Sequence, residues 1–389
     1  MESGGTDERT KLTDLIRKRA DEDTFEGKYN ASVRKKILFI ISVLILAIIV
    51  SLLGVGLGAV DIPLIDVLKV FGHAIFPSMV GEPSKIYYSD FIFAGRLPRV
   101  LLVILTGFSL GAAGMIMQGL LRNPLVSPFT LGVSTAASFG AAMAILMGPL
   151  IFGEMLNTVF YVGSINFPAK NLVAVLFAFA FAMVSMVLIL VLTRDKKVSR
   201  SLVILAGVVI SYLFQAGITA SKYFSDDQQL REITLWIMGS MNGATWGAIL
   251  LLLPIVVICG IYLFKISLDI NTLSAGDDVA STLGINVPKL RKRGLLICTL
   301  MTSACLAFTG VIGFIGLMAP HICRMIIGND PRYLLPASAL MGVLILSVSD
   351  LFCRLIIRPG ELPVGIVLYV IGGIFFIWMI SNKRWSHRV

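Results

Sequence analysis

The sequence predicts an all-α protein that crosses a membrane many times, and three observations lead to this expectation. Of the 389 residues, 57% are hydrophobic and only 14% are charged, and the mean hydropathy is +0.89. Soluble domains carry about 25% charged residues. The apolar residues also fall into long runs, and a helix needs about 20 of them to cross the hydrocarbon core with its backbone polar groups satisfied. We therefore expect a polytopic helical bundle.

Nine apolar segments are long enough, or nearly so, to cross a bilayer. They cover residues 37–59, 99–121, 129–151, 171–193, 202–221, 245–266, 294–319, 333–357 and 362–381. The seventh run continues from Gly294 to Ile327, and as one helix it would measure about 51 Å, which is too long for one span. Three glycines and a proline in its middle weaken a helix. We therefore expect a break near residues 310–314 and ten transmembrane helices.

The distribution of basic residues favours ten spans with both termini in the cytoplasm. Lys and Arg accumulate on the cytoplasmic side, and ten spans leave fewer of them outside than nine spans do. The domains expected are a charged cytoplasmic tail over residues 1–35, one ten-helix domain over 36–382 and a cytoplasmic tail over 383–389. The first tail has no apolar stretch of the kind found in cleavable signal peptides. This orientation places residues 60–98 outside, including Arg96 and Arg99.

Several functional classes are disfavoured by the sequence. The net charge of +10 comes from basic loops between apolar segments, which require no nucleic acid. The five cysteines lie in apolar segments without CxxC spacing, so we expect buried hydrophobic residues rather than a metal site. No phosphate-binding GxxxxGK[ST], HExxH or GxSxG motif occurs. The chain is therefore expected to be neither an ATPase nor another enzyme, and to need no cofactor.

Small residues recur at helical spacing in two spans. They are Gly107 and Gly111 in the second span, and Gly132, Ala136, Gly140 and Ala144 in the third. Such stripes allow helix backbones to approach closely. They predict a compact bundle rather than the lining of a channel.

The longest inside loop, residues 271–294, predicts a short amphipathic helix. Ser274 stands three residues before Asp277, as an N-cap does before acids of the first turn, and a glycine ends the pattern. Val279 and Leu283 share one face at i, i+4. A helix of this size is marginal in water and must dock, either on its own bundle or on a partner protein. The spacing favours neither alternative.

Two further features are expected near the outer face. Residues 225–243 begin with acids, carry an apolar stripe and end in glycine, which predicts a short helix lying on the outer surface. Within the spans, only Asp350 and Arg354 are clearly charged, and their i, i+4 spacing allows them to form an ion pair.

The order of several motifs resembles the permease subunits of FecCD-type ABC importers, which take up iron siderophores, haem and cobalamin. The resemblance covers residues 95–382 and rests on GRLPRVLL, LAGV, LWIMGS, LGIN, GFIGLMAPHICR, LLPASALMG and ELPVGI. It implies ten helices per subunit, a homodimer around a central pathway, two separate cytoplasmic ATPase subunits and an extracytoplasmic substrate-binding protein. Residues 273–288 would then form the coupling helix that sits in a groove of the ATPase.

The resemblance also implies roles for particular residues. Docking to glutamates of the binding protein is implied for Arg96, Arg99 and Arg354, although Arg354 could instead be held by Asp350, and Arg99 could reach the lipid headgroups. Coupling to the ATPase is implied for Ser274, Asp277, Asp278, Val279, Leu283 and Gly284. The cytoplasmic gate is implied at Asn123, Leu125, Arg200 and Ser201. Position 200 departs from the pattern, because a small hydroxyl residue is expected there.

The sequence therefore predicts the permease subunit of an ABC importer for a metal chelate, located in the cell membrane. The alternative is a stand-alone secondary transporter. Such a transporter usually binds its coupling ion with acids inside the membrane or with broken helices, and among the spans only Asp350 offers an acid.

Overall fold

The computed structural model describes residues 25–58, 60–162, 165–193 and 200–381, and nearly all of this part is helical. Eight helices of the described chain are long and apolar enough to cross a membrane. They contain α2 (Phe25–Gly56), α5 (Leu97–Leu121), α6 (Val133–Phe152), α7 (Ala169–Leu192), α8 (Arg200–Phe224), α10 (Trp246–Ser274), α14 (Pro331–Ile356) and α15 (Val364–Ser381). The predicted all-α membrane fold is thus confirmed. The first helix of the described chain begins at Phe25, inside the segment expected to be a charged cytoplasmic tail.

The long seventh run is divided as its glycines predict. Helix α12 (Val287–Thr309) ends before Gly310, whose φ of 68° favours glycine, and α13 (Ile315–Ile327) follows after a five-residue break. The break at 310–314 is therefore confirmed. That α12 and α13 both cross the bilayer stays a prediction, because α12 opens with a basic stretch and α13 has only 13 residues, about 20 Å.

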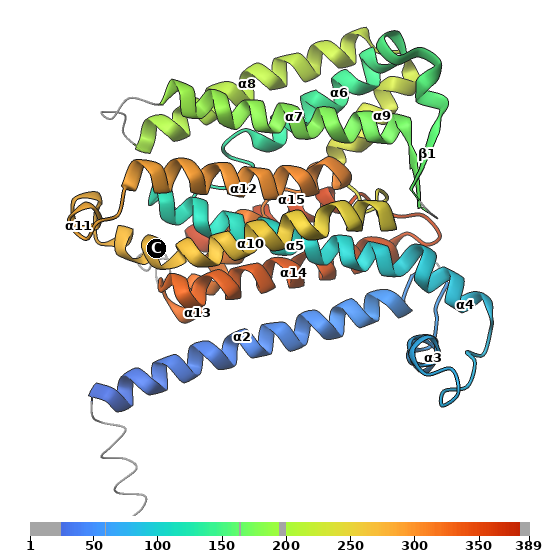
Figure 1. Cartoon of the computed structure of the whole chain (residues 1–389), viewed down its shortest axis with the longest axis horizontal. Helices are drawn as coiled ribbons and strands as arrows, with labels where there is room; N and C mark the ends of the chain where they lie inside the picture. Colours follow the sequence, from blue (N-terminus) through green and yellow to red (C-terminus); the bar gives the residue numbers. More distant parts are fainter. Residues whose placement is uncertain (1–24, 59, 163–164, 194–199, 382–389) are drawn as a thin grey trace, which may run out of the picture.

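Helix α5 is the centre of the bundle and packs against α14, α12, α10 and α13 (Figure 1). Glycines make this packing possible. A Cβ added to Gly107 would lie 2.7 Å from the carbonyl oxygen of Gly342 in α14, and one added to Gly111 would lie 2.2 Å from that of Ser338. In α6, a Cβ on Gly140 would lie 2.4 Å from the carbonyl of Phe177 in α7. The predicted close packing of the two small-residue stripes is confirmed.

One end of the bundle carries α11 (Asp277–Thr282), and we call it the α11 end. Helix α2 begins at this end, and α5 finishes there (Figure 1). The opposite end, which we call the α3 end, carries α3 (Leu64–Ile75), α4 (Tyr87–Asp90), the hairpin of β1 (Val159–Val162) and β2 (Ile165–Pro168), and α9 (Asp227–Met238).

The segment expected to be an outer loop, residues 60–98, is more ordered than predicted. Helix α3 packs Val67 and Val70 into a small apolar core with Tyr88 and Ile92. From Tyr87 the chain is helical without interruption through a π-helical turn, η1 (Phe91–Arg96), into α5. The helix of the second span therefore begins twelve residues before its apolar run, which starts at Arg99, because the helix extends beyond the apolar stretch.

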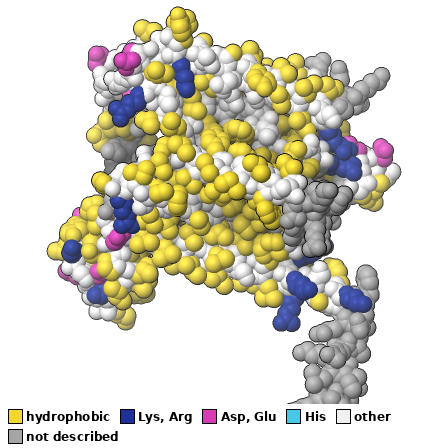
Figure 2. Space-filling model, turned by 180° about the vertical axis from the view of Figure 1, so that it is seen from behind, with side chains coloured by type: hydrophobic (Ala, Val, Ile, Leu, Met, Phe, Trp, Pro, Cys, Tyr) yellow, Lys and Arg dark blue, Asp and Glu magenta, His cyan; other side chains and the backbone are white. Residues whose placement is uncertain are grey.

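The surface agrees with a protein surrounded by lipid. Figure 2 shows a broad band of hydrophobic side chains across the middle, with basic and acidic side chains gathered toward the two ends. Helix α2 is the most exposed, since only 17% of its most apolar stretch is buried. The five cysteines, Cys259, Cys298, Cys305, Cys323 and Cys353, are all free and buried, as predicted.

Candidate functional site

An ion-pair network at the α3 end includes two of the arginines expected to dock a partner. Arg99 of α5 donates from Nε and Nη2 to one carboxylate oxygen of Asp350, at 3.1 and 2.9 Å. The other oxygen of Asp350 lies 3.0 Å from Nε of Arg354, as their i, i+4 spacing predicts. Nη1 of Arg99 also lies 2.6 Å from Glu361. Asp350 and Arg354 are buried, whereas Arg99 keeps 15% of its side chain exposed.

The carbonyls at the end of α2 are bound by arginines from elsewhere in the chain. Arg354 donates to the carbonyls of Gly54 and Leu57, at 2.9 and 3.2 Å. Arg96 donates to those of Val55 and Gly56, at 2.7 and 2.6 Å. The last carbonyls of a helix lack partners within the helix and carry partial negative charge, so cations are favoured there. Both arginines therefore cap the C-terminal end of α2, and both lie at the end of the bundle that is expected to face outside.

At the other end, the short predicted helix exists as α11, but it is shorter than residues 273–288 and begins differently. Ser274 is the last residue of α10, and its hydroxyl donates to the carbonyl of Asn271. The N-cap of α11 is Gly276, which makes no side-chain cap. The predicted N-cap role of Ser274 is therefore wrong, because α10 continues farther into the loop than its apolar run does.

The two faces of α11 differ in burial, which bears on whether this helix docks on its own bundle or on a partner protein. Ala280 is fully buried against the bundle, whereas the side chains of Val279 and Leu283 are 45% and 68% exposed. Asp278 is also exposed, and Gly284 follows the helix with φ of 85°, as the predicted stop requires. One face of α11 thus packs on its own bundle, whereas the apolar pair predicted from the i, i+4 spacing stays largely exposed in the described structure.

The residues expected to form the inner gate lie near α11. Arg122 ends α5 with a left-handed φ of 48°, and the side chain of Asn123 then accepts a hydrogen bond from the backbone N–H of Leu125 at 2.9 Å. Arg200 opens α8, and its Nη2 lies 2.7 Å from Oδ1 of Asp277 in α11. The next residue, Ser201, is exposed.

Comparisons with known proteins place the chain in a family. The profile of the FecCD transport family matches residues 43–382. The chain belongs to the FecCD transport family. It is 37% identical to the hemin transport system permease of Yersinia pestis, over 74% of this chain and 82% of that protein. The same identity and coverage relate it to the vitamin B12 import system permease of Vibrio cholerae.

The fold of this FecCD permease is also similar to a solved structure. An ABC transporter in an inward-facing conformation superposes with a TM-score of 0.73 and 25% identity, covering 88% of this chain and 98% of that chain. The chain is thus a multi-pass membrane transport permease, as the ordered motifs of the sequence predict.

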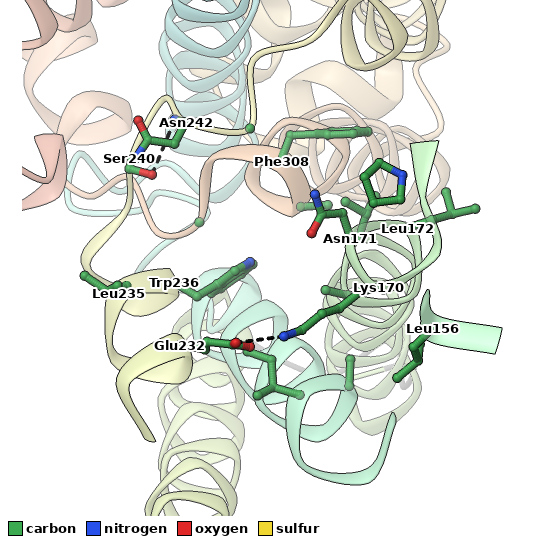
Figure 3. Close-up of a pocket in the computed structure, with 18 of the residues that line it drawn as sticks. Leu156, Lys170, Asn171, Leu172, Glu232, Leu235, Trp236, Ser240, Asn242 and Phe308 are labelled. Atoms are coloured by element: carbon green, nitrogen blue, oxygen red, sulfur yellow. Dashed lines mark hydrogen bonds and ion pairs between the residues drawn. The ribbon is translucent and has the colours of Figure 1, made fainter. Parts of the chain in front are cut away.

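The FecCD permease has a cavity of about 700 Å³ at its α3 end that sequence reasoning did not predict. Lys170 of α7 and Glu232 of α9 point toward one another across it and form an ion pair at 2.7 Å (Figure 3). The aromatic rings of Trp236 and Phe308 form part of its wall. Phe167 and Pro168 of the β1–β2 hairpin and Leu156, in the turn before it, also line the cavity. The lining therefore comes from segments far apart in the chain, and no local sequence pattern indicates that they meet.

The described residues of this FecCD permease contain no group of three or more His, Cys, Asp or Glu side chains that could hold a metal ion. The three expected docking arginines lie at one end, and the expected coupling and gate residues at the other. Sequence reasoning missed Glu361 as a partner of Arg99 and Arg291 as a partner of Asp277. Only their charge marked them in the sequence.

Proposed function

We propose that this FecCD permease is the membrane subunit of an ABC importer that moves a metal chelate, such as haem, a ferric chelate or cobalamin, into the cell. The observation that carries the proposal is the family match across residues 43–382. Relatives that transport hemin and vitamin B12 support the chelate class. In this proposal the ATPase and the substrate-binding protein are separate partners, and the permease acts as a homodimer of ten-span subunits with cytoplasmic termini.

At the α11 end, we propose that α11 is the coupling helix that seats in the ATPase. The pair Val279 and Leu283 supports this role, because apolar side chains that stay largely exposed in their own chain suit contact with a partner. The helix is held to its own bundle through buried Ala280. Movement of the ATPase would therefore be passed to the spans rather than absorbed by a loose loop.

At the α3 end, we propose that Arg99, with Arg96 beside it, receives acidic side chains of the binding protein. Arg99 supports this role best, because it remains partly exposed and points both at buried Asp350 and at the more exposed Glu361. Arg354 has only 5% of its side chain exposed. For Arg354 we propose the positioning alternative, in which it orients Asp350 and caps α2.

Transport by the reconstituted complex tests the proposal. The permease, its partner ATPase and the cognate binding protein are reconstituted in liposomes, and haem, ferric chelates and cobalamin are tried in turn. We expect uptake of one chelate class that requires both ATP and the binding protein. Uptake by the permease alone, driven by an ion gradient, would show a secondary transporter instead.

A further inference from the structure

We propose that the ion pair between Arg200 and Asp277 ties the cytoplasmic gate to the coupling helix, so that α8 and α11 move as one unit during transport. The inference rests on the proposed function, because it requires α11 to be moved by a partner ATPase. The two atoms, Nη2 of Arg200 and Oδ1 of Asp277, lie 2.7 Å apart. The residues are 77 positions apart in the chain and belong to different helices.

The pair belongs to a network, and this distinguishes it from an ordinary surface pair. The second oxygen of Asp277 lies 3.2 Å from Nη2 of Arg291, at the start of α12. Arg291 in turn donates from Nε to the carbonyl of Leu120 in α5, at 3.1 Å. An isolated exposed ion pair contributes little, but a carboxylate held between two guanidiniums is fixed in direction. Asp277 therefore connects α8, α11 and α12 at the first residue of the coupling helix.

The other expected gate loop is attached to the same region. Arg122, at the left-handed end of α5, donates from Nη2 to the carbonyl of Ser274, at 3.2 Å. Ser274 ends α10 immediately before α11, and Arg122 immediately precedes Asn123. The loop of Asn123 and Leu125 and the start of α8 are thus both attached at the N-terminal end of α11.

The length of the side chain at position 200 decides whether this link can exist. A serine or threonine at the same backbone position ends two atoms from Cα and could not reach Asp277 as the guanidinium does. With arginine, a displacement of α11 acts on the N-terminal end of α8. Without it, α11 remains attached to α12 through Arg291, but α8 is no longer pulled.

This geometry predicts a loss of coupling rather than a loss of folding or assembly. In the reconstituted complex, Arg200→Gln should lower the number of chelate molecules imported per ATP hydrolysed by about threefold to fivefold, the upper part of the range for one partly exposed ion pair. The ATPase rate and the amount of bound ATPase subunit should stay close to the values of the unmodified complex. Arg200→Lys should restore part of the ratio.

Two more variants sharpen this test. Asp277→Asn should lower the ratio at least as much as Arg200→Gln, and the double variant should be no worse than Asp277→Asn, because both changes remove the same link. Arg332→Gln is the matched control. Arg332 forms an ion pair of 2.8 Å with Asp330 and a side-chain hydrogen bond with Tyr29, so the link that it makes is between α14 and α2 and not between α8 and α11. Its removal should leave the ratio unchanged.

A cross-linking experiment tests directly whether α8 and α11 move together. In the double variant Arg200→Cys/Asp277→Cys, a bifunctional thiol reagent whose spacer matches the length of the lost ion pair should cross-link α8 to α11. The native cysteines are buried, so the reagent should react with the two introduced thiols. The joined complex should keep ATP-driven uptake. Blocked uptake, an unchanged ratio in Arg200→Gln, or parallel loss of ATPase binding would each overturn the link. Absence of ATP-driven uptake in the unmodified complex would instead overturn the proposed function.

Discussion

Arg99 of α5 and Asp350 of α14 lie 251 residues apart in the chain, yet Nε and Nη2 of Arg99 both donate hydrogen bonds to Oδ1 of Asp350. The second oxygen of Asp350 faces Arg354, which also binds the end of α2. A single buried carboxylate thus joins three helices at the α3 end of the permease. In such surroundings an unpaired charge is far more costly than an intact pair.

Asp350 is therefore expected to be the most sensitive residue of this network. Asp350→Ala should lower the free energy of unfolding by about 3 kcal/mol, because it leaves two guanidiniums without their shared carboxylate. Thermal unfolding of the purified permease in detergent measures the change. Glu361→Gln is the matched control, since Glu361 is 35% exposed and its loss should cost less than about 1 kcal/mol. Equal melting temperatures for the two variants would contradict this account.

Glu361 also offers a test of docking that leaves the buried pair intact. In the free permease it occupies one side of the Arg99 guanidinium, at 2.6 Å, and would compete with an acid from the binding protein. Glu361→Gln should therefore tighten binding-protein association by about threefold at low salt, with less gain at high salt. Affinity is measured with the permease in nanodiscs. Weaker association would show that Glu361 itself contributes to the interface.

Reversing the charge of the docking arginines should weaken binding-protein association, whereas removing the charge of Glu361 should strengthen it. Arg96→Glu combined with Arg99→Glu should weaken association with the binding protein in a salt-dependent way, because it replaces attraction by repulsion. Arg231→Glu is the control, since Arg231 is an exposed arginine on α9 at the same end. Folding must be compared alongside, because Arg99 also holds Asp350. Unchanged affinity in the folded double variant would exclude docking at these residues.

The exposed face of α11 should determine retention of the ATPase subunit. A carboxylate introduced by Val279→Glu or Leu283→Glu would have to be buried without a partner in the groove of the ATPase. We expect at least a tenfold loss of ATPase subunit in pull-downs of the solubilised permease, equivalent to about 1.4 kcal/mol. Leu235→Glu makes the same chemical change at an exposed leucine on α9 and should leave retention unchanged. Full retention by both α11 variants would argue against coupling through this helix.

The central packing of α5 leads to a prediction on folding. A Cβ on Gly114 would lie 2.0 Å from the carbonyl oxygen of Gly316, so Gly114→Ala should force the two backbones apart and cost about 1–3 kcal/mol or more. The yield of monodisperse protein and its melting temperature measure this. Gly373→Ala is the control, because an added Cβ there meets nothing within 4 Å. Alanine at position 373 should be neutral or stabilise α15 by up to about 1 kcal/mol.

Local patterns in the sequence were sufficient for much of the fold. The break after Thr309, the presence of a short helix in the loop that contains Asp277 and the close packing at Gly107 all follow from residues within a few positions of each other. The N-cap assigned to Ser274 was wrong because an apolar run does not mark where its helix ends. Helix α3 was missed although its apolar residues recur at helical spacing, since the segment lay between two spans and was treated as a loop.

The partners of the charged residues could not be predicted in the same way. The sequence indicates that Asp350 can reach Arg354, four residues on, but not that Arg99 binds the same carboxylate. Nor does it show that Arg354 caps a helix that ends about 300 residues earlier. Contacts of this kind depend on how helices are arranged, and charge patterning alone does not select between partners that are far apart in the chain.

The segment between α3 and α4 should loosen at acid pH. Asp66 accepts hydrogen bonds from the backbone N–H of Ser84, at 3.1 Å, and from its hydroxyl, at 2.8 Å. These bonds lower the pKa of Asp66 below its ordinary value of 3.8. Because the folded-state pKa is lowered, the stabilisation is present above the unfolded pKa and is lost as pH falls through the folded one.

Hydrogen exchange around Ser84 should therefore differ strongly between the unmodified protein and Asp66→Asn at neutral pH. The difference should vanish once the pH is well below 3.8, and a constant difference across this range would show that the charge of Asp66 does not hold the segment.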